Sequence, residues 1–553
     1  MKIFFSILAL CLPVILLYGQ FFWNPIVFDD ANFFDGSAHQ QYLDKVFSFD
    51  LRWLPYATFE WTRVLLGLDL IWFRLGNLAL HLGTTITLFL FLRRLFERVL
   101  SANSANSETL SPHWLAFFGA LIFALHPASV YASAYLVQRS TLMATLFALL
   151  TWRLFLEGLI RENYHWLLAS AVTYFLAVFS KEHAIMTPAV SIALLLLVNN
   201  KSTRQRLMLI WPTFVLYALI GGFVVLQVKS GHVLGQAYEP IAASYMSLLG
   251  PDFDVRFAYP LSMLTQCFLF FKYLGVWVAP SPAWMSVDMP QAFALSLWSW
   301  PETAGLVGFI VYPIIAIRLL LQRGLRGLLG FALFCPWLLF ATELSTIRIQ
   351  ESFVLYRSYL WMAGAFAVLP FLCQKLSAKQ AVITLTLVAL LMVPLSWLRL
   401  TTFSHPLLLW DDAAQQVENT EETRLGIDRI FYNRGRELIG VKHYAEAIDD
   451  LSKVIKKNGY YVGYAYKNRG LAYLESREYL LALNDLNKAI EQVPTNKEQL
   501  YLGKAHALEG LNDLTAAIQA YQQACLLGLP TACQKTGQSA SPAKSLSEFL
   551  LHP

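Results

Sequence analysis

Apolar segments of about the length needed to cross a bilayer recur along the first 400 residues of this chain. They restrict the fold more than any other feature, because a chain inside lipid must satisfy its backbone hydrogen bonds internally, as helices and closed barrels do. Only 14% of the residues are charged, against about 25% in soluble domains. We therefore predict an all-α polytopic membrane domain over residues 1–400, with segments at about 5–22, 70–92, 114–136, 141–158, 165–180, 183–199, 207–228, 260–280, 303–320, 327–342, 358–373 and 380–399.

Basic residues between these segments predict their orientation, since cytoplasmic loops carry an excess of Lys and Arg. The clusters comprise Arg93, Arg94, Arg98, Arg153, Arg161, Lys201, Arg204, Arg206, Arg318, Arg323, Arg326, Lys375 and Lys379. Placing them in the cytoplasm puts the N-terminus inside and the aromatic and acidic loop at 23–69 outside. The segment at 260–280 then cannot make one simple crossing: it lies at the interface, re-enters, or pairs with residues 291–300. We expect 11 spans, with 12 or 13 as alternatives; 11 spans place the C-terminal part outside the cytoplasm.

From about residue 425 the pattern changes to amphipathic helices with a period of 35 residues, as in the series Ala447, Ala482, Ala517 and the series Leu451, Leu486, Tyr521. This pattern is typical of tetratricopeptide helix pairs, and three stacked pairs are about the minimum for a continuous core. We predict a linker at 401–424, a tetratricopeptide α-solenoid at 425–535 that offers its concave surface to a peptide or protein, and a disordered tail at 536–553. Cys525 and Cys533 can form a disulfide if that domain lies in an oxidising compartment.

Two adjacent carboxylates, Asp29 and Asp30, follow the first apolar segment, which we interpret as a retained helix because no clear cleavage site follows it. At the membrane–water boundary, such carboxylates can deprotonate an acceptor hydroxyl or bind a divalent cation. The alternative is a solvated turn, where Asp is common. The sequence leaves metal binding by this pair open.

Four basic residues are candidate functional residues, namely Arg139, Lys181, Lys272 and Arg357, and of these Arg139 and Lys181 can pair with a phosphate. Arg139, Lys181 and Arg357 have a plain alternative as boundary residues with their charges in water. Lys272 is a candidate because it lies within an apolar segment. No phosphate loop or dinucleotide fingerprint is found, and the net charge of +5 reflects loop bias rather than nucleic-acid binding. A site outside the cytoplasm would need a lipid-borne donor.

Several blocks, taken in order, resemble the transmembrane and tetratricopeptide-containing O-mannosyltransferases of the GT-C glycosyltransferase superfamily. The blocks are Phe28-Asp29-Asp30, Arg52-Trp-Leu-Pro55, Phe73 with Asn77 and His81, Leu125-His126-Pro127, Ala134-Tyr135 with Gln138-Arg139, Ser180-Lys181-Glu182 with Thr187-Pro188, Tyr356-Arg357-Ser-Tyr359-Leu360, and Leu409-Trp410-Asp411-Asp412. Arg74 and Leu355 depart from the family pattern, which usually has His and an acidic residue there.

The resemblance implies transfer of a sugar from a polyprenyl-phosphate-linked donor to Ser or Thr of a protein outside the cytoplasm, in a bacterial inner membrane. Asp29 or Asp30 would be the base, and the four basic residues would neutralise the leaving phosphate. The substrate cavity would be lined by Arg52, His81, His126, Gln138, Glu182, Tyr356 and Tyr359. The alternatives are the same chemistry on an envelope glycan or lipid, and a non-catalytic membrane scaffold built on the repeats.

Overall fold

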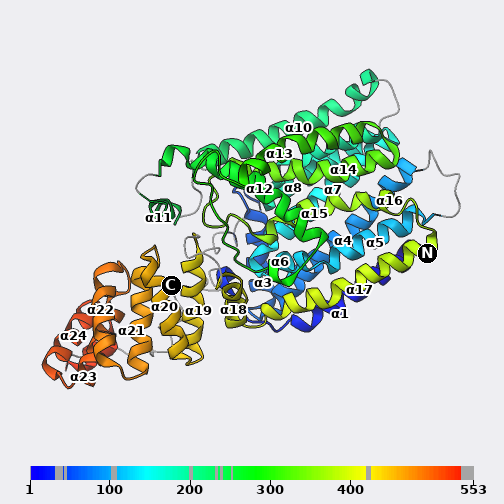
Figure 1. Cartoon of the computed structure of the whole chain (residues 1–553). Helices are drawn as coiled ribbons and strands as arrows, with labels where there is room; N and C mark the ends of the chain where they lie inside the picture. Colours follow the sequence, from blue (N-terminus) through cyan, green and yellow to red (C-terminus); the bar gives the residue numbers. More distant parts are fainter. Residues whose placement is uncertain are drawn as a thin grey trace.

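The computed structural model describes residues 2–30, 42, 47–100, 109–198, 203–230, 235–236, 241–250, 253–418 and 425–536, which form helices and irregular segments without a β-strand. Residues up to 418 form a helical bundle (Figure 1). Its helices are α1 (Lys2–Tyr18), α3 (Trp53–Leu66), α4 (Leu70–Leu100), α5 (Pro112–Leu125), α6 (Pro127–Ser133), α7 (Arg139–Arg161), α8 (Tyr164–Ser180), α9 (Thr187–Val198), α10 (Thr203–Ser230), α11 (Ala242–Ser247), α12 (Ala258–Val278), α13 (Glu302–Leu321), α14 (Gly324–Phe340), α15 (Ser358–Ala365), α16 (Leu369–Leu372), α17 (Ala378–Thr402) and α18 (Pro406–Val417).

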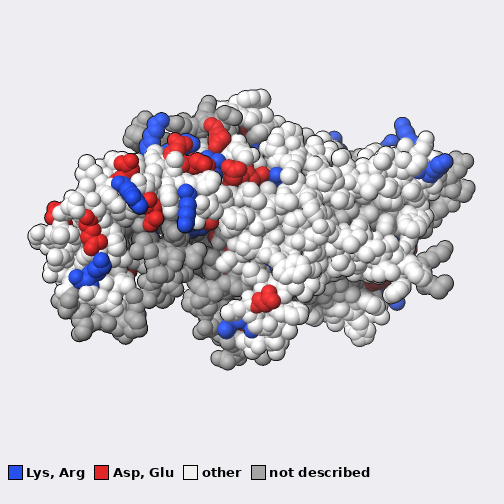
Figure 2. Space-filling view, turned by 90° about the horizontal axis from the view of Figure 1, so that it is seen from below, with Lys and Arg blue, Asp and Glu red and all other residues white. Residues whose placement is uncertain are grey.

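Eight helical segments among the described residues are long and apolar enough to cross a membrane, or nine if the bent pair α5–α6 counts as one span. Two shorter apolar segments, Tyr164–Ser180 and Glu182–Val198, add to this number. The predicted count of 11 leaves out α12 and therefore needs the bent pair α5–α6, both short segments and α15–α16 to cross as well. On the face seen in Figure 2, a broad uncharged zone separates the charged residues near the repeats from those at the opposite end, as a lipid-facing surface requires.

The two ends of the bundle differ in charge. The C-terminal ends of α14 and α17 point toward the C-terminal repeats. Glu351, in the segment after α14, and Asp411, in the helix after α17, both pair with arginines of the repeats. We call this the repeat end, and the other the far end. α14 and α17 therefore start at the far end, where Arg323, Lys375 and Lys379 lie beside their first residues. The N-terminus also lies at the far end (Figure 1), so the structure groups these basic residues with the N-terminus, as the sequence predicted.

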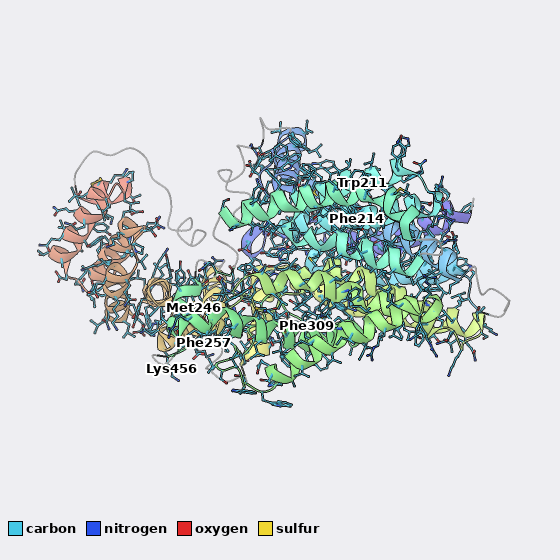
Figure 3. The ribbon with its side chains drawn as sticks, turned by 90° about the horizontal axis from the view of Figure 1, so that it is seen from above. Trp211, Phe214, Met246, Phe257, Phe309 and Lys456 are labelled. Atoms are coloured by element: carbon cyan, nitrogen blue, oxygen red, sulfur yellow. A yellow bond between two sulfur atoms is a disulfide. The ribbon has the colours of Figure 1, made fainter. Side chains whose placement is uncertain are left out.

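Helices α12 and α13 run in the same direction. Gly305 packs against Phe268 and Gly308 packs against Phe271, so the residue numbers rise together along the two helices. Figure 3 shows Phe257, directly before α12, near the junction with the repeats. Both helices therefore begin toward the repeat end, and the chain between them has to return there.

The return is made by residues 279–301, which have no α-helix. Gln291 accepts a hydrogen bond from Lys272, whereas Ala294 donates to Thr265, nearer the start of α12. The return segment thus runs back along α12. This geometry agrees with the prediction that 260–280 makes no simple crossing, although α12 has the length and composition of a span.

The described part of the predicted linker at 401–424 is largely helical. α17 continues to Thr402, and His405 caps α18 by accepting a hydrogen bond from the Leu407 N–H. Trp410 of α18 is buried, and Arg399 of α17 donates to Asp412 at 2.8 Å. The segment is therefore packed against its neighbours through buried apolar side chains and this ion pair. Residues 419–424 lie outside the described residues, as does the predicted tail beyond 536.

The predicted repeats form three helix pairs with a last short helix: α19 (Ile427–Gly440), α20 (Tyr444–Lys457), α21 (Val462–Glu475), α22 (Tyr479–Gln492), α23 (Lys497–Gly510), α24 (Leu514–Leu526) and α25 (Pro530–Lys535). Contacts repeat with the sequence period. Arg434 Nε donates to Asp450 at 2.7 Å, and Arg469 Nε, 35 residues later, donates to Asp485 at 2.7 Å. Cys525 and Cys533 form a disulfide between α24 and α25.

The charge difference between the ends predicts the topology. If the far end is cytoplasmic, the repeats at the other end lie outside the cytoplasm. A reporter that is active only after export should then be active when fused after Ala540, and a reporter that is active only in the cytoplasm should be inactive there. Paired fusions of an export-dependent phosphatase and of a cytoplasm-dependent fluorescent protein provide the measurement. Fluorescence with an inactive phosphatase would contradict the assignment.

Candidate functional site

The first loop is fastened to the bundle by Asp30, whose side chain is fully buried. Its carboxylate accepts hydrogen bonds from the backbone N–H groups of Val137 (2.9 Å) and Val27 (3.4 Å). Burial raises the pKa of Asp30 to about 7, against the effect of these bonds. Nearby, Arg74 of α4 donates to the carbonyl oxygens of Asn24, Pro25 and Ala134. Asp30 and Arg74 therefore hold the first loop against the turn before α7.

Asp29 has a different environment, because it is only half-buried. Its backbone N–H donates to the Tyr135 hydroxyl at 3.2 Å, and the Tyr135 side chain also hydrogen-bonds to its carboxylate. Burial, and then the negative charge of Glu351, raise the pKa of Asp29 to about 6. A partly exposed acidic residue with a pKa near neutrality suits a general base. The structure thus favours Asp29 over Asp30 for that role.

A small pocket lies beside Lys181, at the break between α8 and α9. Lys181 Nζ donates to Gln138 Oε1 (3.0 Å) and Thr141 Oγ1 (2.7 Å), and it lies 4.9 Å from the centre of the Tyr356 ring. All three of these partners are neutral. Burial, and then the positive charge of Arg52, lower the pKa of Lys181 to about 7. The pocket is lined by Thr141, Ala144, Thr145, Lys181, His183, Ala184, Arg357, Leu360 and Trp361.

Arg357 lines the same pocket, but two carboxylates already meet its charge. It donates to Glu343 Oε2 at 3.1 Å and to Glu351 Oε2 at 2.9 Å. The Tyr356 hydroxyl donates to the same Glu351 oxygen at 2.9 Å, and His183 Nε2 lies 3.1 Å from Glu343. Lys181 is therefore better placed than Arg357 to supply charge to an incoming anion.

The first loop also contributes Arg52, which forms an ion pair with Glu182 through two nitrogens. This pair lies next to Lys181, whose pKa both residues affect. The Tyr135 and Tyr356 ring centres are 6.4 Å apart, which connects the surroundings of Asp29 with the pocket. The structure thus brings together seven predicted residues: Asp29, Arg52, Gln138, Lys181, Glu182, Tyr356 and Arg357.

Two predicted phosphate ligands lie apart from this pocket. Arg139 is buried between α3 and α4, where it donates to Asn77 and to the Phe73 carbonyl and lies 4.1 Å from the centre of the Phe59 ring. Lys272 donates to Gln291 and lies 4.8 Å from the centre of the Phe353 ring. Their contacts hold helix α3 and the return segment in place.

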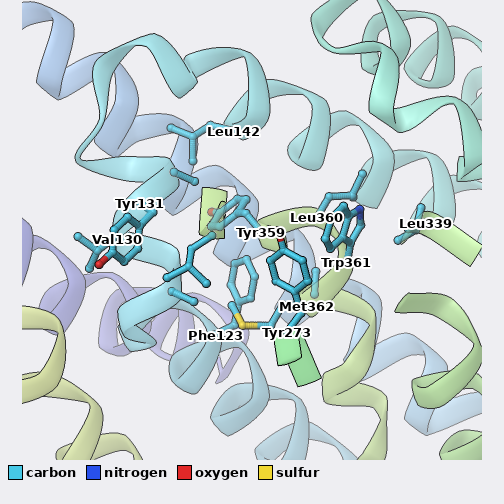
Figure 4. Close-up of a cluster of buried hydrophobic side chains, with 14 of the residues drawn as sticks. Phe123, Val130, Tyr131, Leu142, Tyr273, Leu339, Tyr359, Leu360, Trp361 and Met362 are labelled. Carbon is cyan, nitrogen blue, oxygen red and sulfur yellow. The ribbon is translucent and has the colours of Figure 1, made fainter. Parts of the chain in front are cut away.

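Three predicted cavity residues are parts of the core. His81 and Tyr359 hydrogen-bond each other at 2.7 Å, and His81 Nε2 bonds the Ala124 carbonyl. Tyr359 lies in the apolar cluster of Figure 4, beside Phe123. His126 accepts from the Ala128 N–H, which caps α6, and bonds the Trp277 carbonyl at 3.1 Å. These side chains hold helices together and do not line the pocket.

The proposed divalent cation finds little support in the geometry around Asp29 and Asp30. Both Asp30 oxygens accept backbone hydrogen bonds. No group of three or more His, Cys, Asp or Glu side chains among the described residues is arranged to hold a metal ion. Asp35, also in the first loop, lies outside the described residues.

Sequence reasoning did not select four residues that complete the site. Tyr135 bonds Asp29 and Thr141 bonds Lys181, and Arg429 of α19 reaches Asp288 in the return segment at 2.7 Å. Tyr135 stood inside a block of the family resemblance, so its position was a usable signal. Asp288 and Arg429 lie 141 residues apart in sequence, and their pairing has no local signal.

Comparison with known proteins identifies one part of the chain. Residues 498–527, which cover most of α23 and α24, match the tetratricopeptide repeat family. The chain carries a tetratricopeptide repeat. No curated protein was found to match the chain. Ala447, Ala482 and Ala517, which are buried at equivalent positions 35 residues apart in the three helix pairs, extend this tetratricopeptide array toward the bundle.

The different environments of the two acids can be tested by stability. Asp30→Asn should lower the free energy of unfolding by about 1–3 kcal/mol. The amide nitrogen of Asn is a donor, so it cannot accept the second of the two backbone hydrogen bonds. Asp29→Asn, at a half-exposed position, should change it by about 0.5 kcal/mol or less. Thermal unfolding of the purified full-length protein in detergent would show the difference. Equal loss in both variants would contradict the assigned roles.

Proposed function

We propose that this chain is a GT-C-type glycosyltransferase of the bacterial inner membrane, with its site and repeats outside the cytoplasm. It moves a sugar from a polyprenyl-phosphate-linked donor to a Ser or Thr hydroxyl of a protein. The observation that carries the proposal is the connection between Asp29, a partly buried residue with a pKa raised to about 6, and a pocket lined by Lys181. Tyr135, the hydrogen-bond partner of Asp29, has its ring centre 6.4 Å from that of Tyr356, whose ring contacts Lys181. A carboxylate and a lysine connected in this way can remove a proton from an acceptor and hold an anionic leaving group.

In the proposed reaction, the acceptor hydroxyl oxygen forms a bond to the anomeric carbon of the sugar, and its proton passes to Asp29. The bond from that carbon to the phosphate oxygen breaks, and the electron pair leaves with the polyprenyl phosphate. Lys181 faces the leaving phosphate, and positive charge placed there lowers the energy of the transition state. Arg357 lines the same pocket and contributes through its position, since Glu343 and Glu351 share its charge.

The apolar bundle and the tetratricopeptide array support the choice of donor and acceptor. A donor with a polyprenyl chain partitions into the membrane beside the apolar helices. Tetratricopeptide arrays offer extended concave surfaces to other molecules, which favours a protein acceptor. A glycan or lipid acceptor remains the alternative product class. Mass spectrometry of envelope proteins and glycans from cells with and without the gene distinguishes these acceptors, and no difference in either would count against transfer.

The role of Asp29 predicts a pH profile. A base must be deprotonated to act, so transfer at saturating donor should fall about tenfold for each pH unit below pH 6 and level off above it. Asp29→Asn should reduce the rate by roughly 10²–10⁴-fold and abolish this acid limb. The measurement is transfer by the purified protein in nanodiscs between pH 4.5 and 8. An unchanged rate and profile in the variant would rule out Asp29 as the base.

Donor binding should depend on Lys181. Lys181→Met keeps the length of the side chain but removes its charge, and it should weaken binding of the lipid-linked donor by roughly 10-fold or more. Lys272→Met, a matched change outside the pocket, should leave the affinity nearly unchanged. Binding to the wild type should weaken as the pH rises through about 7, where Lys181 loses its proton. Equal loss of affinity in both variants would contradict the placement of the donor phosphate.

A further inference from the structure

The first helix of the tetratricopeptide array reaches into the bundle through Arg429. Its side chain is 3% exposed, although Arg429 belongs to the array and not to the helical bundle. Nε donates to Asp288 Oδ2 at 2.7 Å, and another nitrogen lies 3.8 Å from Glu351 Oε1. A buried arginine with two carboxylate neighbours is a fixed contact, because separating such charges leaves them without compensation.

The neighbours of Arg429 belong to the candidate site. Glu351 accepts hydrogen bonds from Arg357, which lines the pocket, and from Tyr356, whose ring contacts Lys181. The guanidinium also lies 5.9 Å from the centre of the Phe28 ring, directly before Asp29 in sequence. Phe28 in turn stacks on Tyr135, the hydrogen-bond partner of Asp29. One side chain of the array is thus linked to both Asp29 and the pocket.

A second set of contacts fixes α19 in place near this point. The Tyr245 hydroxyl of α11 donates to Asp428, the residue before Arg429, at 3.3 Å. Arg434, about one turn further along α19, pairs with Asp411 of α18 at 3.1 Å. The start of the array is therefore held from two sides, and Arg429 has a fixed place.

We infer that Arg429 is a positioning residue of the candidate site and that α19 forms one of its walls. The inference rests on the proposed function for the meaning of the site, but the contact itself can be tested separately. This inference changes the expected role of the array. The first helix of the array completes the site, and the later helices remain available for binding a partner. An array joined through a flexible linker could not supply such a contact.

The charge of Arg429 gives the inference a signature beyond packing. Arg429 favours the ionised form of Asp29, whereas Glu351 and Asp288 oppose it. Replacing Arg429 by Gln should therefore raise the pKa of Asp29 and move the acid limb of transfer to higher pH, by roughly half a unit to one unit. The ionisable groups that face Asp29 from the packed elements are Asp30, Tyr135, Asp288, Glu351, Tyr356 and Arg429.

The first experiment measures hydrogen exchange of the full-length protein in nanodiscs. Arg429→Gln should speed exchange in residues 283–291 and 346–357, which hold its carboxylate partners. Arg469→Gln is the matched control, because Arg469 makes the same Nε contact of 2.7 Å, but with Asp485 inside the array. Exchange in the two segments that equals the wild type in Arg429→Gln would overturn the inference, whatever the reaction of the protein is.

The second experiment measures the pH profile of transfer in the same variants. The inference expects the acid limb to shift in Arg429→Gln, to stay near the wild type in Arg429→Lys, which keeps the charge, and to be unchanged in Arg469→Gln. Faster exchange with an unshifted limb would reduce Arg429 to a structural lock and overturn the positioning role. If the wild type shows no transfer, the proposed function fails while the exchange experiment still decides the contact.

If Arg429→Gln fails to fold, a double variant can replace it in these experiments. The double variant Asp288→Asn with Arg429→Gln removes both charges of the closest pair, so it avoids leaving Asp288 buried alone. It should fold, lose protection in residues 346–357 because Glu351 has lost one cation, and retain a shifted acid limb. Wild-type exchange in this double variant would overturn the inference.

Discussion

The carboxylates of Glu343, which is buried, and of Glu351, which is partly buried, hold the candidate site together. Arg357 binds both of them, His183 approaches the first, and Arg429 approaches the second. These groups come from the turn before α9, the segment after α14 and the first repeat helix. Because a buried charge without a partner is costly, the network tolerates only small displacements of its members. The positions of Lys181, Tyr356 and Asp29 depend on that restriction.

Features set by local pattern were predictable from the sequence. The apolar segments, the grouping of basic residues at one end and the 35-residue period each follow from side chains close together in the chain. Counting crossings against charged loops also predicted that the segment at 260–280 makes no simple single crossing, with three arrangements left open. Seven of the predicted site residues meet at the repeat end, because the first loop, the α8–α9 turn and the segment before α15 all end there.

Features set by tertiary partners were not predictable. Arg139, Lys181, Lys272 and Arg357 look alike in sequence, since each is a basic residue beside an apolar segment. The fold separates them: Lys181 and Arg357 line a pocket, while Arg139 and Lys272 hold neighbouring segments. Asp29 and Asp30 differ in the same way, through hydrogen bonds to residues more than 100 positions away. The predicted linker includes Asp411 and Asp412, and their pairing with Arg434 of α19 and Arg399 of α17 could not be predicted from local sequence.

The repeated Arg–Asp pairs have a consequence for the last helix pair of the array. The equivalent positions there are Lys504 and Ala520, so the ion pair of the two earlier helix pairs cannot form. In an array stabilised only by nearest neighbours, disorder spreads inward from the weaker end. The Cys525–Cys533 disulfide lies at that end and restrains it covalently. Reduction of this disulfide would therefore let the array unfold from its C-terminus toward α19, and the contacts of α19 with the site would be lost last.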